Sequence, residues 1–154
     1  MCQPAGPILL VEDETTDALL FRRAVEKITK NPPIIEISNG DEAVEYLVGS
    51  GRYADRRKYP LPSLIVLDVK LPRRNGFEVL EWIRSQPDNL RFTPVLMLSS
   101  SDRSDDVEKS YSHGANSYMT KPFGTEEYTR MANAFAGFWL KYNEQGQCPR
   151  LTAS

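Results

Sequence analysis

The fold that we expect for this chain is decided by one stretch, Leu64-Ile65-Val66-Leu67-Asp68-Val69-Lys70-Leu71-Pro72. Its four consecutive apolar residues indicate a strand that is buried on both faces, as strands of parallel sheets are. Asp68 closes the apolar run, so its carboxylate is expected at the carboxyl end of that strand. Open α/β sheets bind their ligands at this end. The stretch therefore predicts a parallel sheet with an acidic site at one edge.

A second apolar run ends in acids as well, because Glu12 and Asp13 follow Ile8-Leu9-Leu10-Val11. If the strand order reverses between the two runs, these acids and Asp68 converge on one crevice. Carboxylate oxygens suit Mg²⁺, a hard cation, whereas no histidine or cysteine lies near enough for a zinc site. The pattern predicts a divalent-metal site with a carboxylate nucleophile.

Apolar runs and helical patterns alternate five times along the chain. This alternation predicts an α/β fold, a doubly wound five-stranded parallel sheet with helices on both faces. We expect strands over residues 8–12, 34–38, 64–68, 95–99 and 117–120. We expect a first helix that carries Ala18, Phe21, Val25 and Ile28, and further helices over 41–48 and around 77–83. A fourth helix is expected to start at 104 and to carry Val107 and Tyr111, and a last helix to start at about 125.

The length, net charge, apolar stretches and cysteines of the chain limit the functions that it can have. A length of 154 residues suits one compact domain, with a core over about 7–143 and short tails. The formal charge of −2 gives no reason to expect nucleic acid or an anionic membrane as a partner. No apolar stretch reaches the length of a membrane span, and the start lacks a signal-peptide pattern. Cys2 and Cys148 do not make a disulfide framework, so a cytoplasmic protein is expected.

The segment Gly49–Pro62 is longer than most connections in such folds. It enters the 64–68 strand from the amino end, which is the edge of the sheet opposite Asp68. We therefore expect it to take no direct part in chemistry. A plain surface loop is the favoured interpretation, and a contact with a partner is the alternative.

Two further strand ends point to the same crevice. Strand 95–99 ends at Ser99, and Lys121 follows strand 117–120. A lysine and a hydroxyl opposite a carboxylate and Mg²⁺ form a set that can bind a phosphoryl group. Asp68 would then attack phosphorus in line and become an aspartyl phosphate.

At this point the chain resembles the receiver domain of bacterial two-component response regulators. The matching pieces are Val11–Glu14, Leu64–Asp68 with Pro72 and Gly76, Val95–Ser99, and Gly114–Phe123. Two positions depart from the commonest pattern: Glu12 stands where Asp is more frequent, and Ser99 where Thr is more frequent. Both keep the chemical group that the family uses.

The resemblance implies the flavodoxin-like strand order 2-1-3-4-5 and a role for each matched residue. Asp68 is the implied phosphoacceptor, and Lys121 is the lysine that binds the phosphoryl group. The implied Mg²⁺ ligands are Asp68, Glu12, Asp13 and the backbone carbonyl of Lys70. Ser99 is the implied switch hydroxyl and Tyr118 the aromatic switch residue.

The implied function is that of a stand-alone response regulator. A sensor histidine kinase would phosphorylate Asp68, and the domain would lose the phosphoryl group slowly by its own hydrolysis. The face formed by the helix from Ser104, strand 117–120 and the last helix would then bind a downstream protein or form a homodimer. Some apolar side chains of the last helix must cover the sheet, but the set is broader than one stripe needs, so an apolar surface for a partner or a dimer is the further interpretation. The set is Tyr128, Met131, Phe135, Phe138, Trp139 and Tyr142. The long 49–62 segment and Phe138-Trp139-Leu140 are similar to regulators paired with phytochrome-type kinases.

Other functions remain open at this stage. The main alternative is a pseudo-receiver, a binding module that is never phosphorylated, although such proteins usually lose an acid or the lysine. A phosphatase of the haloacid dehalogenase type would need Asp where this chain has Lys70. A flavodoxin-like carrier of FMN would need a phosphate-binding loop after the first strand, and none follows Val11.

Overall fold

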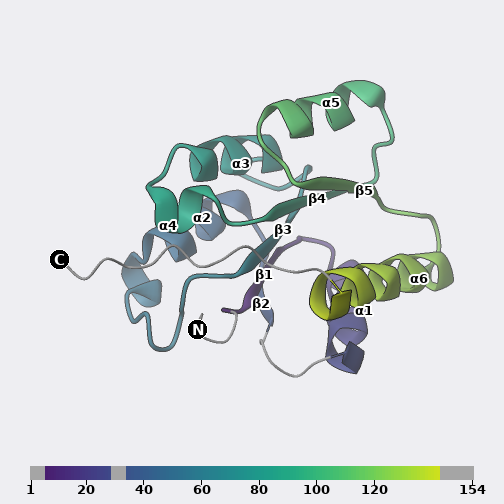
Figure 1. The fold of residues 1–154 in the computed structure, drawn as a ribbon, viewed down its shortest axis with the longest axis horizontal. Coiled ribbons are helices and arrows are strands. Elements are labelled where there is room, and N and C mark those ends of the chain that lie inside the picture. The colour runs from purple at the N-terminus through teal and green to yellow at the C-terminus, as the bar shows by residue number, and fades with distance from the viewer. Residues whose placement is uncertain (1–5, 29–33, 143–154) are drawn as a thin grey trace.

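The computed structural model describes residues 6–28 and 34–142. Within these residues the chain forms one parallel sheet in the order β2-β1-β3-β4-β5 (Figure 1). The strands are β1 (Ile8–Val11), β2 (Ile34–Ile37), β3 (Leu64–Asp68), β4 (Val95–Ser99) and β5 (Ser117–Thr120). The expected α/β fold, with its five strands and their order, is confirmed.

Helices cover both faces of the sheet, and each face has its own core (Figure 1). On one face, α1 (Thr15–Ile28) and α6 (Thr125–Ala136) pack over Ile8 and Leu10. On the other face, α2 (Gly40–Val48) and α3 (Gly76–Arg84) pack over Leu9 and Val11. Successive strand residues point to opposite faces, so an unbroken apolar run is what a strand covered on both sides requires.

The remaining elements are α5 (Ser104–Ser112), the short helices η1 (Gly51–Tyr53) and α4 (Asp88–Arg91), and η2 (Gly137–Tyr142), a π-helix that continues α6. The sequence did not predict η1 or α4, since a single turn leaves no periodic pattern. It placed residues 137–142 on the last helix, and the structure shows that they continue α6 as a π-helix. No helix among the described residues is long and apolar enough to cross a membrane. Cys2 and Cys148 lie outside the described residues.

Two apolar residues of the expected helical patterns are exposed rather than buried. Ile28, the last residue of α1, is 42% exposed. On α5, Tyr111 is 50% exposed, Val107 is half-buried and the fully buried residue is Ser110. The hydroxyl of Ser110 donates to the carbonyl of Asp106, which allows this small polar side chain to face the sheet. Helix α5 is thus held by little apolar burial.

The segment Gly49–Pro62 is more than the plain surface loop that we expected. Tyr53 is 4% exposed, and its ring lies 5.0 Å from the ring of Tyr46 and 5.0 Å from that of Tyr59. Arg56 donates to the carbonyls of Tyr46 and Leu47 in the last turn of α2, where the regular hydrogen bonds of the helix run out. These contacts fold the segment back onto α2, and sequence periodicity cannot reveal such non-local packing. The segment still joins β3 at the end away from Asp68.

Helix α2 begins in direct contact with the loop that follows Asp68. The N–H of Gly40 donates to the carbonyl of Pro72 at 3.4 Å. A Cβ atom on Gly40 would lie 1.8 Å from the carbonyl oxygen of Arg74, so only glycine fits. Gly76 meets the same limit, because its Cβ would lie 2.2 Å from the carbonyl oxygen of Asp68. The loop beside the acidic site is therefore fixed by two close backbone approaches.

We expect Gly40→Ala to lower the free energy of unfolding by about 1–3 kcal/mol, because the loop carrying Arg74 must shift to admit the new methyl group. Gly137→Ala is the matched control: its Cβ would meet nothing within 4 Å, and its backbone is already helical. Urea denaturation of both variants measures the difference. Equal stabilities for the two variants would contradict the close approach.

Candidate metal and phosphoryl site

The predicted acids meet at the carboxyl edge of the sheet. Val11 of β1 pairs in register with Leu67 of β3, so the residues that follow them, Glu12 and Asp68, lie side by side. Both are only 5% exposed, whereas Asp13 is exposed to solvent. One carboxylate oxygen of each of the three acids lies within 4.8 Å of the others. The grouping expected from the sequence is thus present.

Lys121 lies between these acids. Its backbone N–H donates to the carbonyl of Ser99, which ties the start of the β5–α6 loop to the end of β4. Its Nζ atom lies 2.6 Å from Oε2 of Glu12 and 2.9 Å from Oδ2 of Asp68, and its side chain is 9% exposed. Burial lowers the pKa of Lys121, but the two carboxylates outweigh burial and raise that pKa above its usual value. The lysine is therefore charged.

The pKa of Glu12 is also raised, but for a carboxyl group this favours the neutral form, whereas for Lys121 it favours the charged form. Burial, followed by the charge of Asp68, raises the pKa of Glu12 from 4.5 to about 7, against the lowering effect of Lys121. Burial is the main cause for Glu12, and the carboxylates here, which outnumber the single ammonium group, contribute to both shifts. Additional positive charge would relieve this excess, which is what a divalent cation supplies.

The two oxygens of Asp68 have separate partners. Oδ1 accepts the backbone N–H of Lys70 at 3.1 Å, and Oδ2 accepts a hydrogen bond from Lys121. The side chain of Lys70 is exposed and takes no part in this contact. The carboxylate is thus held in one orientation, with the loop after β3 on one side and Lys121 on the other.

Ser99 and Tyr118 meet at the turn after β4. Ser99 is fully buried, and its Oγ atom accepts the backbone N–H of Ser101 at 3.1 Å. The hydroxyl of Tyr118, which is half-buried on β5, donates to the carbonyl of Ser101 at 2.6 Å. Asp68 pairs in register with Leu98, so Ser99 follows on the neighbouring strand. Both predicted switch residues therefore hold one short turn beside the site.

Two polar residues near the site were not predicted. Asp17, in the first turn of α1, places its Oδ2 atom 3.0 Å from Nζ of Lys121. Tyr128, on α6, is 3% exposed, and its buried hydroxyl has no hydrogen-bond partner among the described residues. Burial raises the pKa of Tyr128, and the charge of Asp17 raises it further. An acid in the first turn of a helix usually interacts with the helix dipole, so nothing in the sequence indicated that Asp17 lies in the site.

The three grouped acids suit a hard divalent cation, because all the side-chain donors are carboxylate oxygens. Glu12 and Asp13 come from one strand end and Asp68 from its neighbour, so ligands from two elements converge on one point. The backbone carbonyl of Lys70 as a further ligand stays a prediction.

The family model for the response regulator receiver domain matches residues 8–133. The chain belongs to this family, whose members act as signalling switches. The expected resemblance is confirmed, and receiver domains bind a divalent metal at this acidic pocket.

Two curated relatives are similar over most of their length. The response regulator Rcp1 of Synechocystis sp. is 36% identical over 138 residues, which cover 90% of this chain and 91% of Rcp1. The probable methanogenesis regulatory protein FilR2 of Methanothrix harundinacea is 36% identical over 139 residues, covering 88% and 84%.

Solved structures show the same likeness. The Mn²⁺-bound form of Rcp1 aligns with a TM-score of 0.84 at 34% identity, covering 92% of this chain and 99% of that one. The phosphorylated cyanobacterial phytochrome response regulator RcpA aligns with a TM-score of 0.81 at 34% identity, covering 91% and 97%.

The raised pKa of Glu12 predicts a pH-dependent stability. Between pH 4.5 and about 7, the folded protein binds a proton at Glu12 that the unfolded chain has lost. Stability from this group is present below pH 4.5 and lost as the pH rises to about 7. Glu12→Gln removes this loss, so without divalent metal its stability relative to wild type should increase across that range.

Urea denaturation at several pH values, without divalent metal, measures this difference. Mg²⁺ should reduce it at the upper end, because a cation favours the ionised carboxylate. Glu126→Gln, which removes a surface carboxylate on α6, is the control and should show no such trend. A difference between Glu12→Gln and wild type that does not change with pH would contradict the assigned shift.

Proposed function

We propose that this protein is a single-domain response regulator that a partner histidine kinase phosphorylates on Asp68 with the help of Mg²⁺. The observation that carries the proposal is the contact of Lys121 with the buried carboxylate of Asp68, directly beside the acidic group. A structural ion pair would not need further acids crowded around it. A phosphoryl-transfer site does, because it must hold a metal and a lysine near one nucleophile.

In this mechanism Asp68 is the nucleophile. One of its oxygens attacks the phosphorus of a phosphohistidine in line, and the bond from phosphorus to the imidazole nitrogen breaks as the new P–O bond forms. Lys121 lies close enough to place its positive charge on a phosphoryl oxygen. A bound Mg²⁺, held by Glu12, Asp13, Asp68 and the carbonyl of Lys70, supplies further positive charge against the phosphoryl group. Slow hydrolysis of the aspartyl phosphate resets the domain.

Ser99 and Tyr118 carry the signal away from Asp68. A phosphoryl oxygen on Asp68 would offer the hydroxyl of Ser99 a charged and therefore strong acceptor. A shift of Ser99 moves the turn at Ser101, which both residues hold. Tyr118 follows that turn, and α5 follows with it, because α5 is held by little apolar burial. This is a two-state equilibrium that a local charge biases.

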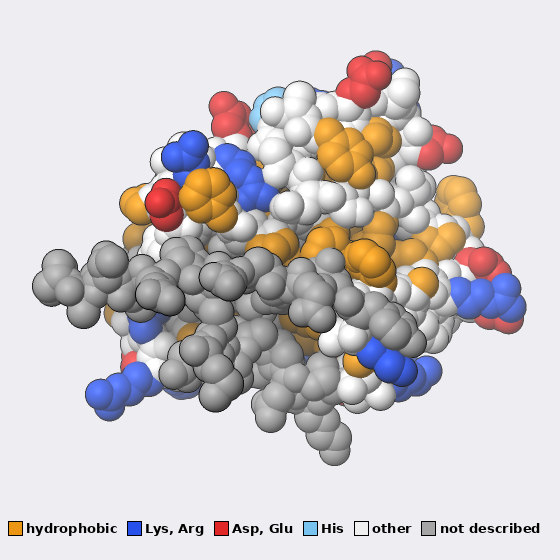
Figure 2. All heavy atoms as spheres, in the orientation of Figure 1, with side chains coloured by type: hydrophobic (Ala, Val, Ile, Leu, Met, Phe, Trp, Pro, Cys, Tyr) orange, Lys and Arg blue, Asp and Glu red, His pale blue; other side chains and the backbone are white. Residues whose placement is uncertain are grey.

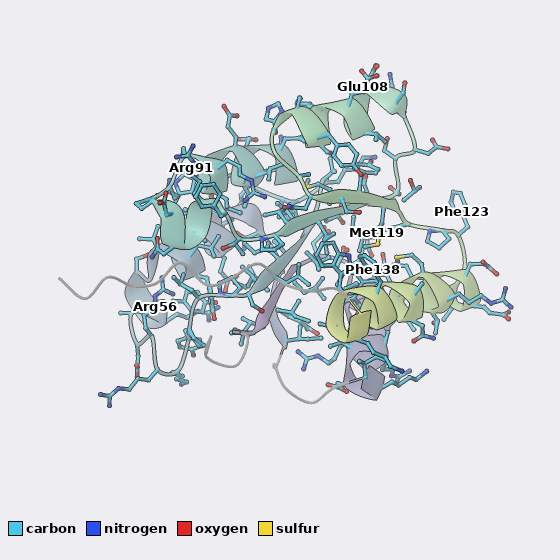
Figure 3. The ribbon with its side chains drawn as sticks, viewed as in Figure 1. Arg56, Arg91, Glu108, Met119, Phe123 and Phe138 are labelled. Atoms are coloured by element: carbon cyan, nitrogen blue, oxygen red, sulfur yellow. The ribbon has the colours of Figure 1, made fainter. Side chains whose placement is uncertain are left out.

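The kinase is expected to approach over the β5–α6 loop. Phe123, two residues after Lys121, is 96% exposed, and its ring points away from the loop into solvent (Figure 3). We propose this ring as an anchor for the partner, because buried aromatic side chains often dominate the binding energy of an interface. Since RcpA is a phytochrome response regulator, we propose a phytochrome-type kinase as the partner, acting in the cytoplasm.

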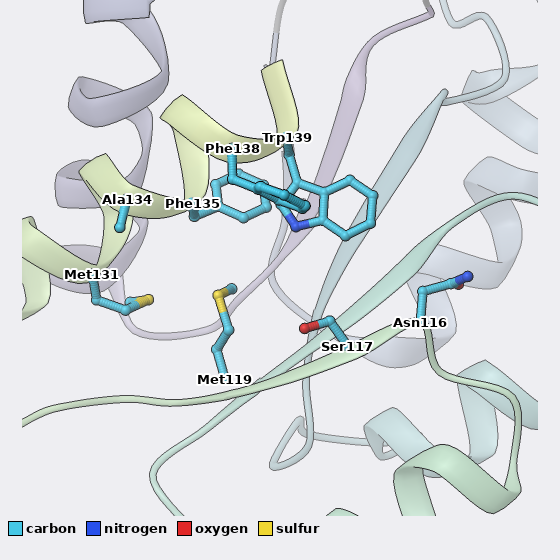
Figure 4. A pocket seen from close by; sticks show the side chains of 8 residues that line it. All are labelled: Asn116, Ser117, Met119, Met131, Ala134, Phe135, Phe138 and Trp139. Carbon is cyan, nitrogen blue, oxygen red and sulfur yellow. The ribbon is translucent and has the colours of Figure 1, made fainter. Parts of the chain in front are cut away.

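The output surface is proposed on α5, β5 and α6. Hydrophobic side chains gather on the face between α5 and α6 (Figure 2). A hollow of about 550 Å³ lies there between β5 and α6, and Met119 points across it toward Phe135 and Phe138 (Figure 4). Phe138 is 54% exposed. We propose that phosphorylation makes this surface bind a second copy of the chain or a downstream protein.

Incubation with acetyl phosphate and Mg²⁺ tests phosphorylation directly. Wild type should gain the mass of one phosphoryl group, and Asp68→Asn should gain none, because an amide cannot act as the nucleophile. Intact-mass spectrometry measures both. Asp41→Asn, which removes a surface carboxylate on α2, is the matched control and should be phosphorylated like wild type. An unmodified wild type at millimolar Mg²⁺ would favour the pseudo-receiver instead.

Self-association tests the output surface. We expect beryllofluoride, which imitates the phosphoryl group, to promote a dimer of wild type, and Phe138→Ala to raise the dimer dissociation constant about tenfold. Phe92→Ala is the control, since Phe92 is also exposed, at 64%, but follows α4. Sedimentation velocity over a concentration series measures both. Equal loss in the two variants would argue against this surface.

A further inference from the structure

Lys121 contacts three carboxylates, and only two of them belong to the group of acids that could hold a metal, which we call the metal group. Its Nζ atom lies 2.6 Å from Glu12, 2.9 Å from Asp68 and 3.0 Å from Asp17. The first two acids belong to the group that could hold a metal, and Asp17 does not. Asp17 therefore contacts the lysine without being placed to contact the cation.

Lys121 and a divalent cation would share two of the same carboxylates, those of Glu12 and Asp68. The ammonium group is bound to Oε2 of Glu12 and Oδ2 of Asp68, which are oxygens of two of the three grouped acids. A cation that enters must share these carboxylates with a buried positive charge. The closer Lys121 lies to them, the weaker the binding of the cation, since like charges at this separation repel strongly in a water-poor site.

Asp17 is well placed to change this balance. It lies in the first turn of α1, and its side chain is 27% exposed. Helix α1 is fixed against α6 by the packing of Phe21 on Phe135, with ring centroids 4.8 Å apart, and by buried Ala18. Because the helix cannot shift freely, the carboxylate of Asp17 is held at the side of Lys121 that faces α1.

A buried polar group lies on α6 near the site. The hydroxyl of Tyr128 is buried, lacks a hydrogen-bond partner among the described residues and is influenced by the charge of Asp17. Such a group is costly unless it finds an acceptor.

We propose that Asp17 is a positioning residue: when a divalent cation enters, Asp17 gives the ammonium group of Lys121 a carboxylate partner outside the metal group, so that the lysine can move off Glu12 and Asp68. This inference deepens the proposed function and rests on the metal site and the lysine that it assigns. Asp17 supplies a carboxylate for the lysine that does not belong to the group that could hold the metal.

The test is a titration of the folded protein with Mg²⁺ alone, without a phosphoryl donor, followed by calorimetry or amide NMR shifts. Asp17→Asn should raise the Mg²⁺ dissociation constant about threefold to tenfold, since the lysine then has no carboxylate partner outside the metal group to move to. Asp17→Glu, which keeps the charge, should recover most of the affinity. Glu127→Gln removes one negative charge from the start of the neighbouring α6 and should change the dissociation constant less than about twofold.

A double-mutant cycle shows whether Asp17 acts through Lys121. In the Lys121→Met background, adding Asp17→Asn should change the Mg²⁺ dissociation constant less than about twofold. Lys121→Gln serves as a second background if the methionine variant does not fold. An undiminished effect of Asp17→Asn in these backgrounds would mean that the charge of Asp17 acts directly on the cation and not through Lys121. The inference would then be overturned.

The outcome is separable from that of the proposed function. Acetyl phosphate tests Asp68, whereas the Mg²⁺ titration tests Asp17 without any phosphoryl transfer. If wild type accepts a phosphoryl group but Asp17→Asn binds Mg²⁺ like Glu127→Gln, only the inference about Asp17 fails. If wild type binds Mg²⁺ as expected but is never phosphorylated, the inference stands and the phosphorylation switch fails.

Discussion

The ion pairs of Lys121 are the interaction on which the rest of the site depends. Glu12 and Asp68 are buried side by side, an arrangement that would be strongly unfavourable without a positive charge between them. The lysine comes from the far side of β4, and its own backbone is tied to Ser99. One side chain thus joins the ends of β1, β3 and β5. Its removal would leave uncompensated charge in the interior rather than merely one contact fewer.

The backbone around this charge cluster is fixed by steric limits. Gly40 and Gly76 let two chain segments approach more closely than any side chain would permit, and both approaches border the loop after Asp68. The start of α3 adds a capping box between Asn75 and Glu78. The Lys70 N–H that orients Asp68 is therefore carried by a loop held at both ends. The orientation of the carboxylate follows from packing at some distance from it.

Much of this arrangement could be predicted from the sequence, because its signals are local or follow from topology. Unbroken apolar runs such as Ile8–Val11 identify buried strands, and acids directly after them must meet once the strands are neighbours. Asp17 was missed because its spacing fits an ordinary helix start. Tyr53 was missed because its burial depends on Tyr46 and Tyr59, which approach only after the chain folds back. Contacts set by tertiary packing leave no period in the sequence.

The burial of Lys121 also decides how the site responds to salt. At 9% exposure its ion pairs are shielded from mobile ions, whereas pairs such as Arg130–Glu126, at 68% and 82% exposure, are open to them. Screening acts over about 8–10 Å of solvent at physiological ionic strength and weakly inside the protein. Changes in monovalent salt should therefore leave the balance between lysine and divalent cation nearly unaltered. The resting state of the site is then governed by the concentration of divalent ions rather than by total ionic strength.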